Sequence, residues 1–153
     1  MELSLKSKTA LVCGSTQGIG LAIAKELAFL GANCILLARN EDRLKEAVAS
    51  LDSSLGQTHR FAVADFQHTD QVKETAAALA AAGTIHILVN NTGGPAPGLI
   101  QNASADQFLN AFQQHIINNQ QLVQALLPGM KAAGYGRIIN VISTSVTMPI
   151  PNL

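Results

Sequence analysis

Short apolar runs alternate along the chain with segments in which apolar residues recur at helical spacing. The apolar runs cover residues 9–13, 34–38, 61–64, 85–89 and 138–142. Each run is short enough for a strand and is apolar at consecutive positions, which indicates a strand buried on both faces. Such strands are typical of a parallel sheet covered by helices on each side.

The segments between these runs predict amphipathic helices. The expected helices cover residues 19–30, a segment through Leu44, Val48 and Leu51, residues 72–82 and a long helix over 105–133. Asn40 is positioned to cap the second helix, and Ser104 with Gln107 forms the capping-box pattern of the long one. We expect Pro128 and Gly129 to bend the last turns of the long helix.

Strands that alternate with helices predict right-handed crossovers and therefore a doubly wound, Rossmann-like α/β fold. We expect a five-stranded parallel sheet with strand order 3-2-1-4-5. The sequence contains no internal repeat and no linker, so residues 1–153 are expected to form a single domain.

Composition and charge exclude several classes of partner. The net formal charge is zero and the ten basic residues are scattered, so neither nucleic acid nor an anionic membrane is expected as a partner. The sequence has no signal peptide and no apolar run long enough to span a membrane, which predicts a cytoplasmic protein. Cys13 and Cys34 lie inside apolar runs and are expected to be buried, reduced thiols.

A glycine-rich turn joins the first strand to the first helix. Glycines at this place allow a tight turn and let the backbone approach a pyrophosphate, whose charge the helix N-terminus favours. The turn therefore predicts a nucleotide-binding site. Its candidate residues are Gly14, Ser15, Thr16, Gln17, Gly18, Ile19 and Gly20.

The spacing G-x-x-x-G-x-G, preceded by Cys13, resembles the T-G-x-x-x-G-I-G turn of the short-chain dehydrogenase/reductase family. Three further stretches match that family in order: D-F at 65–66, N-N-T-G at 90–93, and L-P-G-M at 127–130 followed by G-R-I-I-N-V at 136–141 and Ser143. The resemblance covers almost the whole chain. Within the family, the chain resembles the 3-oxoacyl-[acyl-carrier-protein] reductases. It implies a homo-oligomer that assembles through helix 105–133 and an enzyme that acts on a small carbonyl or alcohol substrate.

The resemblance also places further cofactor-binding residues at the strand ends. It implies that Asp65 and Phe66 meet the adenine ring of a dinucleotide, and that Asn91, Thr92 and Gly93 contact the same cofactor. Thr92 stands where the family has Ala. The following loop, residues 93–98, is expected to wall the substrate pocket, although a plain connection is the alternative.

The end of the second strand favours one cofactor. A carboxylate there would bond to the ribose 2′-hydroxyl and repel a 2′-phosphate, but this chain carries Arg39 and Asn40 and has no acid before Glu41. A guanidinium can form a charge-assisted pair with the phosphate, so we predict NADP(H) over NAD(H). The alternative is that Arg39 is an ordinary solvated charge.

The resemblance implies a reaction centre made of a Ser, a Tyr and a Lys, supported by an Asn of the long helix. Ser143 matches the Ser, with Ser145 as the nearby alternative, and both could instead be ordinary polar residues at a strand end. Counting back from L-P at 127–128 places His115 at the position of the Asn. Helical spacing assigns His115 to a sheet-facing stripe with Phe108, Phe112, Asn119, Leu122 and Leu126, with Asn118 beside it.

His115 is accordingly the second candidate catalytic residue, and a core histidine bonded to the backbone is the alternative. The other histidines are dispersed and show no metal-ligand spacing. The Tyr and Lys would fall after residue 153 at the family's spacing, beyond a Pro149–Pro151 segment. The only tyrosine, Tyr135, precedes the last strand, and no Y-x-x-x-K occurs in the chain.

Two functions are therefore predicted. The first is an NADP(H)-dependent reductase that interconverts a carbonyl and an alcohol, of which these residues are the N-terminal part, inactive without the Tyr and Lys. The alternative is an NADP(H)-binding module that uses cofactor occupancy for sensing or assembly and has no catalytic activity.

Overall fold

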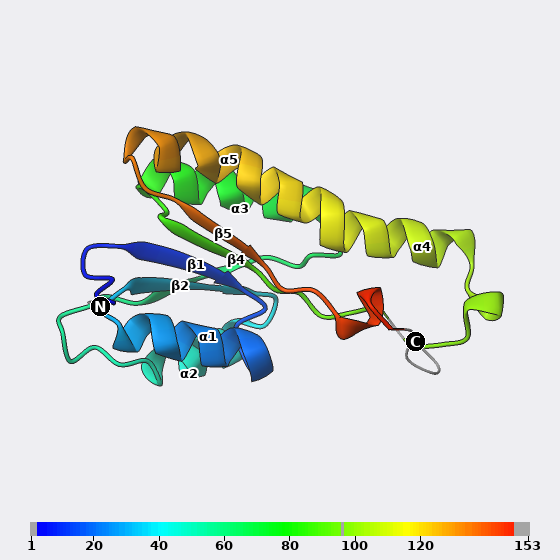
Figure 1. Cartoon of the computed structure of the whole chain (residues 1–153), viewed down its shortest axis with the longest axis horizontal. Helices are drawn as coiled ribbons and strands as arrows, with labels where there is room; N and C mark the ends of the chain where they lie inside the picture. Colours follow the sequence, from blue (N-terminus) through cyan, green and yellow to red (C-terminus); the bar gives the residue numbers. More distant parts are fainter. Residues whose placement is uncertain (1–2, 96, 149–153) are drawn as a thin grey trace.

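The computed structural model describes residues 3–95 and 97–148 and places helices on both sides of one parallel sheet (Figure 1). The strands are β1 (Thr9–Cys13), β2 (Asn33–Ala38), β3 (Arg60–Val63), β4 (Ile87–Asn90) and β5 (Arg137–Asn140). Their order is β3-β2-β1-β4-β5, and all four neighbouring pairs are parallel. The predicted fold class and strand order are confirmed.

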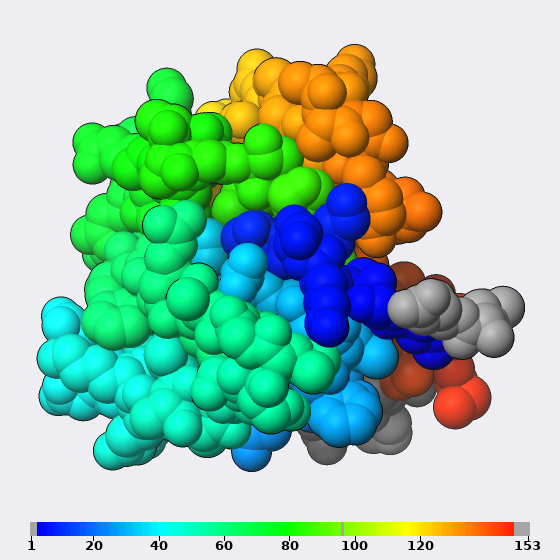
Figure 2. Space-filling view, turned by 90° about the vertical axis from the view of Figure 1, so that its left-hand side faces the viewer, coloured from blue at the N-terminus to red at the C-terminus, as the bar shows by residue number. Residues whose placement is uncertain are grey.

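The helices form one layer on each face of the sheet. One layer contains α1 (Gly18–Phe29) and α2 (Glu41–Ala49), and the other contains α3 (Thr69–Ala82) and α5 (Asn118–Ala132). Figure 2 shows the layers from the end, with the blue N-terminal residues between the green and orange layer and the cyan one. Helix α4 (Ala105–Phe112), the π turn Gln113–Ile117 and the short 3₁₀ helices Ile100–Asn102 and Thr144–Val146 complete the described elements.

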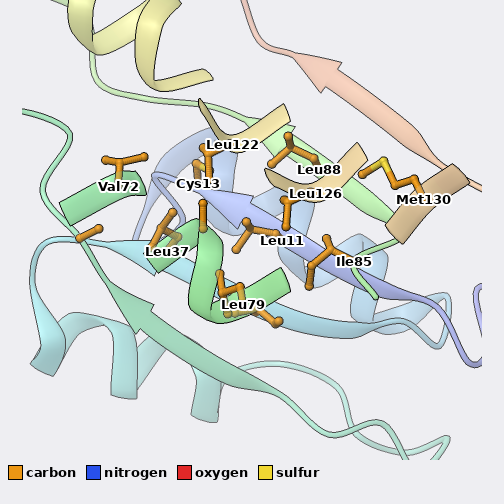
Figure 3. Close-up of a cluster of buried hydrophobic side chains, with 13 residues drawn as sticks. Leu11, Cys13, Leu37, Val72, Leu79, Ile85, Leu88, Leu122, Leu126 and Met130 are labelled. Carbon is orange, nitrogen blue, oxygen red and sulfur yellow. The ribbon is translucent and has the colours of Figure 1, made fainter. Parts of the chain in front are cut away.

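The central strand β1 is buried on both faces. Side chains alternate along a strand, so Leu11 and Cys13 pack into the core beneath α3 and α5, which Figure 3 shows, whereas Ala10 and Val12 pack toward α1 and α2. All four are fully buried. This two-sided burial explains why the run is apolar at every position rather than at alternate ones.

The two cysteines belong to different cores. Cys13 lies in the core on the α3 and α5 side, and Cys34 of β2 lies in the core on the α1 and α2 side. Both are free and buried, which confirms the prediction of reduced thiols. Burial raises the pKa of each thiol to about 12, because the thiolate would lose its solvation in the core.

The caps expected from the sequence are present. The Asn40 side chain accepts a hydrogen bond from the Arg43 backbone N–H at 2.9 Å and caps α2. Ser104 and Gln107 form a reciprocal capping box at the start of α4, in which each side chain bonds to the other residue's backbone N–H. These caps fix where two helices begin, beside the carboxyl ends of the strands.

The long helix expected over 105–133 is interrupted by a π turn at Gln113–Ile117, between α4 and α5. The predicted sheet-facing stripe is therefore partly wrong. Phe108 and Phe112 are each 56% exposed, whereas Asn118, expected beside the stripe, is fully buried. The wider turn shifts the helical phase, and after it the buried positions recur every four residues, at Asn118, Leu122, Leu126 and Met130.

Two apolar surfaces stay exposed in the described part of the chain. One is on and beside α4 and consists of Phe108, Leu109, Phe112 and Ile116. The other lies on the edge strand β5 and consists of Ile138 and Ile139. None of the helices within 3–95 and 97–148 is both long and apolar enough to cross a membrane.

The turn between β1 and α1 depends on close packing of glycines. Gly14 has φ +58° and Gly18 has φ +57°, a conformation that residues with a side chain rarely adopt. A Cβ at Gly20 would collide with the Gly14 carbonyl oxygen and lie 2.8 Å from Asn91 Nδ2. The first turn of α1 can therefore lie directly against the end of β1 only because position 20 has no side chain.

We predict that both thiols resist alkylation in the folded protein. The thiolate is the reactive species, and a pKa of about 12 together with full burial removes it from reagent at pH 8. Iodoacetamide labelling followed by mass spectrometry should show labelling of Cys13 and Cys34 only as the chain unfolds in urea. Rapid labelling of either thiol in native buffer would contradict this packing.

We predict that Gly20→Ala lowers the free energy of unfolding by about 1–3 kcal/mol, the usual cost of overpacking. Urea denaturation measures the change. Gly94→Ala is the matched control, because a Cβ at position 94 meets nothing within 4 Å, so its effect should stay within about 0.5 kcal/mol. Equal effects of the two substitutions would show that the close contact between positions 20 and 14 does not determine the stability of the turn.

Candidate functional site

A cavity of about 600 Å³ lies at the carboxyl ends of β1, β2, β3 and β4. In a doubly wound sheet this edge is where ligands bind. All the predicted cofactor-binding residues except Ser15 and Gly20 line it: Gly14, Thr16, Gln17, Gly18, Ile19, Arg39, Asn40, Asp65, Phe66, Asn91, Thr92 and Gly93. Segments separated by up to about half of the chain therefore meet at one site.

The glycine turn forms the floor of this cavity. The Asn91 side-chain amide donates to the carbonyl oxygens of Cys13 and Gly14, each at 3.2 Å, and so ties the end of β4 to the turn. Ser15 lies inside the turn, fully buried, and its hydroxyl has no hydrogen-bond partner among the described residues. A close-packed glycine turn that holds an unpaired buried hydroxyl fits a bound phosphate group.

Two guanidinium groups line the cavity at the start of α2. Arg39 follows β2 as predicted, and Arg43 lies one helical turn further on, with its Nη1 atom 3.5 Å from Gln17 Oε1. Among the described residues, neither arginine forms an ion pair with a carboxylate. Sequence reasoning missed Arg43, which lies in the first turn of α2 and is brought to the cavity by the start of that helix.

The loop after β3 is fixed by the first residue of α5. The buried Asn118 side chain donates from Nδ2 to the Phe66 carbonyl oxygen at 2.7 Å. Asp65 accepts a hydrogen bond from the Gln67 backbone N–H at 3.0 Å, which closes a turn. Asp65 and Phe66 are thus held at the cavity, and Asn118 is a positioning residue that the sequence did not single out.

His115 lies in the π turn, and its ring contacts the side chain of Thr92 in the cavity wall. Its Nδ1 atom is 2.7 Å from Thr92 Oγ1, so the expected alternative of a histidine bonded to the backbone is wrong. Burial lowers the pKa of His115 below its usual value, because the charged imidazolium is disfavoured there. Burial therefore favours the neutral imidazole. Asn119 donates from Nδ2 to the His115 carbonyl oxygen at 2.6 Å.

The two candidate serines after β5 form one hydroxyl cluster. Ser145 Oγ donates to Ser143 Oγ at 2.7 Å, and the Ser145 backbone N–H donates to the same oxygen at 3.1 Å. Ser143 is exposed and Ser145 is half-buried, and neither lines the cavity. The pair leaves the choice between Ser143 and Ser145 open. The Pro149–Pro151 segment expected to lead onward lies outside the described residues.

Tyr135 lies at the opposite end of the sheet from the cavity. It precedes β5, and its ring is contacted by Lys8 Nζ at 4.5 Å and by the guanidinium carbon of Arg137 at 4.7 Å from the ring centroid. The His86 ring, just before β4, lies 6.2 Å from it. Tyr135 therefore anchors two cations at the amino ends of the strands and cannot reach a ligand in the cavity.

Comparison with known proteins agrees with this geometry. The family model described as short chain dehydrogenase matches residues 8–153. A 3-oxoacyl-[acyl-carrier-protein] reductase FabG from Chlamydia muridarum is 31% identical over 94% of this chain and 58% of its own length. An inactive hydroxysteroid dehydrogenase-like protein 1 from Homo sapiens is 32% identical over 94% of this chain and 44% of its own.

A solved structure shows the same fold. L-sorbose reductase from Gluconobacter frateurii, complexed with NADPH and L-sorbose, superposes with a TM-score of 0.91 at 32% identity, over 99% of this chain and 58% of its own. The chain thus spans about half the length of the curated relatives that it matches. The predicted resemblance, including that to 3-oxoacyl-[acyl-carrier-protein] reductases, is confirmed. The chain belongs to the short-chain dehydrogenase family.

Proposed function

We propose that this chain is part of an NADP(H)-dependent oxidoreductase that interconverts a carbonyl and an alcohol. One observation carries the proposal: the glycine turn and the two arginines line a single cavity, and the end of β2 has no carboxylate to repel a 2′-phosphate. The NADPH complex of L-sorbose reductase, a structural neighbour, supports the same cofactor.

The cavity offers a site for each part of the dinucleotide. The backbone of the turn at Gly14–Gly20 would receive the pyrophosphate, which the N-terminus of α1 favours. Arg39 and Arg43 would bind the 2′-phosphate by charge-assisted hydrogen bonds. Asp65 and Phe66 would border the adenine, and Asn91 to Gly93 would border the nicotinamide half.

The chemistry is divided between the cofactor and the protein. Bound nicotinamide supplies or accepts the hydride. The Ser143 or Ser145 hydroxyl would donate a hydrogen bond to the substrate carbonyl oxygen and hold it for reduction. The proton donor that the family resemblance implies, a Tyr activated by a Lys, has no counterpart within residues 1–153, because Tyr135 lies at the wrong end of the sheet.

Homo-oligomeric assembly belongs to the same proposal. The apolar surface on and beside α4, made of Phe108, Leu109, Phe112 and Ile116, is exposed in the isolated chain. Exposed apolar surfaces that are continuous along a helix are typical of protein interfaces. This surface supports the expected contact between subunits through the long helical segment.

A binding module without catalytic activity is the second candidate function. His115 occupies the position at which the resembled family has an Asn, and a human relative is named inactive. Such a module would keep the glycine turn and Arg39 and would use cofactor occupancy as its signal. NADPH binding without turnover by the complete protein would favour it.

We predict that Arg39→Asp weakens NADPH binding by at least about 30-fold, because a charge-assisted hydrogen bond is lost and a repulsive carboxylate is added. NADH binding should change by less than about threefold, since NADH has no 2′-phosphate. Isothermal titration calorimetry with both cofactors measures the two affinities. Equal losses for NADPH and NADH would refute the assignment of NADP(H).

Lys45→Asp is the matched control for the change in charge. Lys45 is on α2, the helix that follows Arg39, but it is exposed, pairs with Glu41 at 2.9 Å and does not line the cavity. It should leave NADPH affinity within about twofold, because screening weakens charges at this distance. A loss comparable to that of Arg39→Asp would indicate a general field effect rather than a phosphate contact.

We predict turnover by the complete protein and none by residues 1–153 alone. NADPH oxidation followed at 340 nm against ketones and 3-oxoacyl thioesters tests this, with NADPH binding measured in parallel. The shorter chain should bind NADPH but lack the proton donor, which typically contributes 10²–10⁴-fold to the rate. Turnover by residues 1–153 would contradict this division of roles.

A further inference from the structure

Two residues that depart from the resembled family lie in direct contact. Thr92 stands where the family has Ala, and His115 stands where it has Asn. The two positions are 23 residues apart in the chain, yet Thr92 Oγ1 and His115 Nδ1 are 2.7 Å from each other. A hydrogen bond this short joins the wall of the cavity to the helical segment behind it.

Hydrogen bonds within and beside the π turn hold the backbone of His115 in place. At this turn the Asn118 N–H bonds to the Gln113 carbonyl oxygen, five residues earlier. The His115 carbonyl oxygen accepts the Asn119 side-chain amide at 2.6 Å. The backbone that carries the imidazole is therefore held by a side chain as well as by the helix, as is common where π turns occur at functional sites.

The contact satisfies two polar groups that would each be unfavourable alone. His115 without Thr92 would have both ring nitrogens unpaired, because Nε2 is buried and has no partner among the described residues. Thr92 without His115 would lose the partner of its hydroxyl. A polar group that loses its partner is destabilising to the extent that it is buried. Both side chains are partly buried, so each residue is more favourable in the presence of the other.

We propose that Thr92 and His115 act as one positioning pair that fixes the loop after β4 against the cavity. Thr92 lines the cavity beside Asn91 and Gly93, so an anchored hydroxyl restricts where the backbone of this loop can lie. This inference rests on the proposed function, because the ligand that the loop positions is NADP(H).

Neither residue is a proton donor or nucleophile in this account. Thr92 is aligned by His115, and the neutral imidazole acts through the hydroxyl rather than on the substrate. The proposal therefore predicts an effect of the pair on cofactor affinity, and on KM for the cofactor, larger than its effect on kcat.

The test compares Thr92→Val, Thr92→Ser, Thr92→Ala, His115→Asn and the double variant T92A/H115N in the complete protein. Thr92→Val keeps the shape but removes the hydroxyl, and it should weaken NADPH binding by about fivefold. Thr92→Ser, which retains the hydroxyl, should rescue most of that loss. Calorimetric titration with NADPH provides the affinities, and steady-state kinetics provides KM and kcat.

The double variant tests the coupling between the two residues. His115→Asn alone should also lose about fivefold in affinity, but T92A/H115N should lose no more than either single change. Additive losses would overturn the proposal, and so would equal effects of Thr92→Val and Thr92→Ser. A larger change in kcat than in KM would assign His115 a role in the chemical step instead.

A measurement without cofactor separates this inference from the proposed function. The ¹⁵N resonances of the His115 ring report which nitrogen carries the proton, and they should shift in Thr92→Val but not in Thr92→Ser. If NADPH fails to bind the unmodified protein, the proposed function is wrong while this result still tests the contact. Unchanged His115 resonances in Thr92→Val would overturn the pair itself.

Discussion

Burial of β1 on both faces is the constraint on which the rest of the structure depends. Its side chains enter two separate cores, so the strand cannot shift along its axis without disrupting both helical layers. Its carboxyl end, and the glycine turn that follows, are fixed as a result. Asn91 then ties β4 to that turn, and the cavity is built outward from this fixed point.

The cavity combines rigid geometry with a positive charge that is not neutralised within the described residues. The glycine turn is packed too closely to accept a side chain at position 20. Arg39, just before α2, and Arg43, in its first turn, are exposed and have no carboxylate partner among the described residues. A site with these properties pays little in reorganisation when an anion binds, because its backbone is already in place. The same arrangement explains why phosphate recognition is the function that this part of the chain supports best.

The elements that could be predicted from the sequence are those fixed by local patterns. The five strands, the caps at Asn40 and Ser104 and the glycine turn all follow from spacing over a few residues. The π turn, the contact of His115 with Thr92 and the buried Asn118 could not be predicted, because each depends on how distant segments meet. A regular helical period assigned Phe108 and Phe112 to the buried face, but α4 extends beyond the sheet (Figure 1) and none of its residues is buried.

The segment around the π turn holds two walls of the cavity at once. His115 contacts the loop after β4, Asn118 contacts the loop after β3, and α4 with its exposed apolar surface is continuous with both. A contact that shifts α4 would therefore also shift the two loops that wall the cavity, and it would change the affinity of the cavity for its ligand. Because such coupling is reciprocal, a partner that binds α4 more tightly when the cavity is filled must itself raise the affinity of the cavity by the same factor.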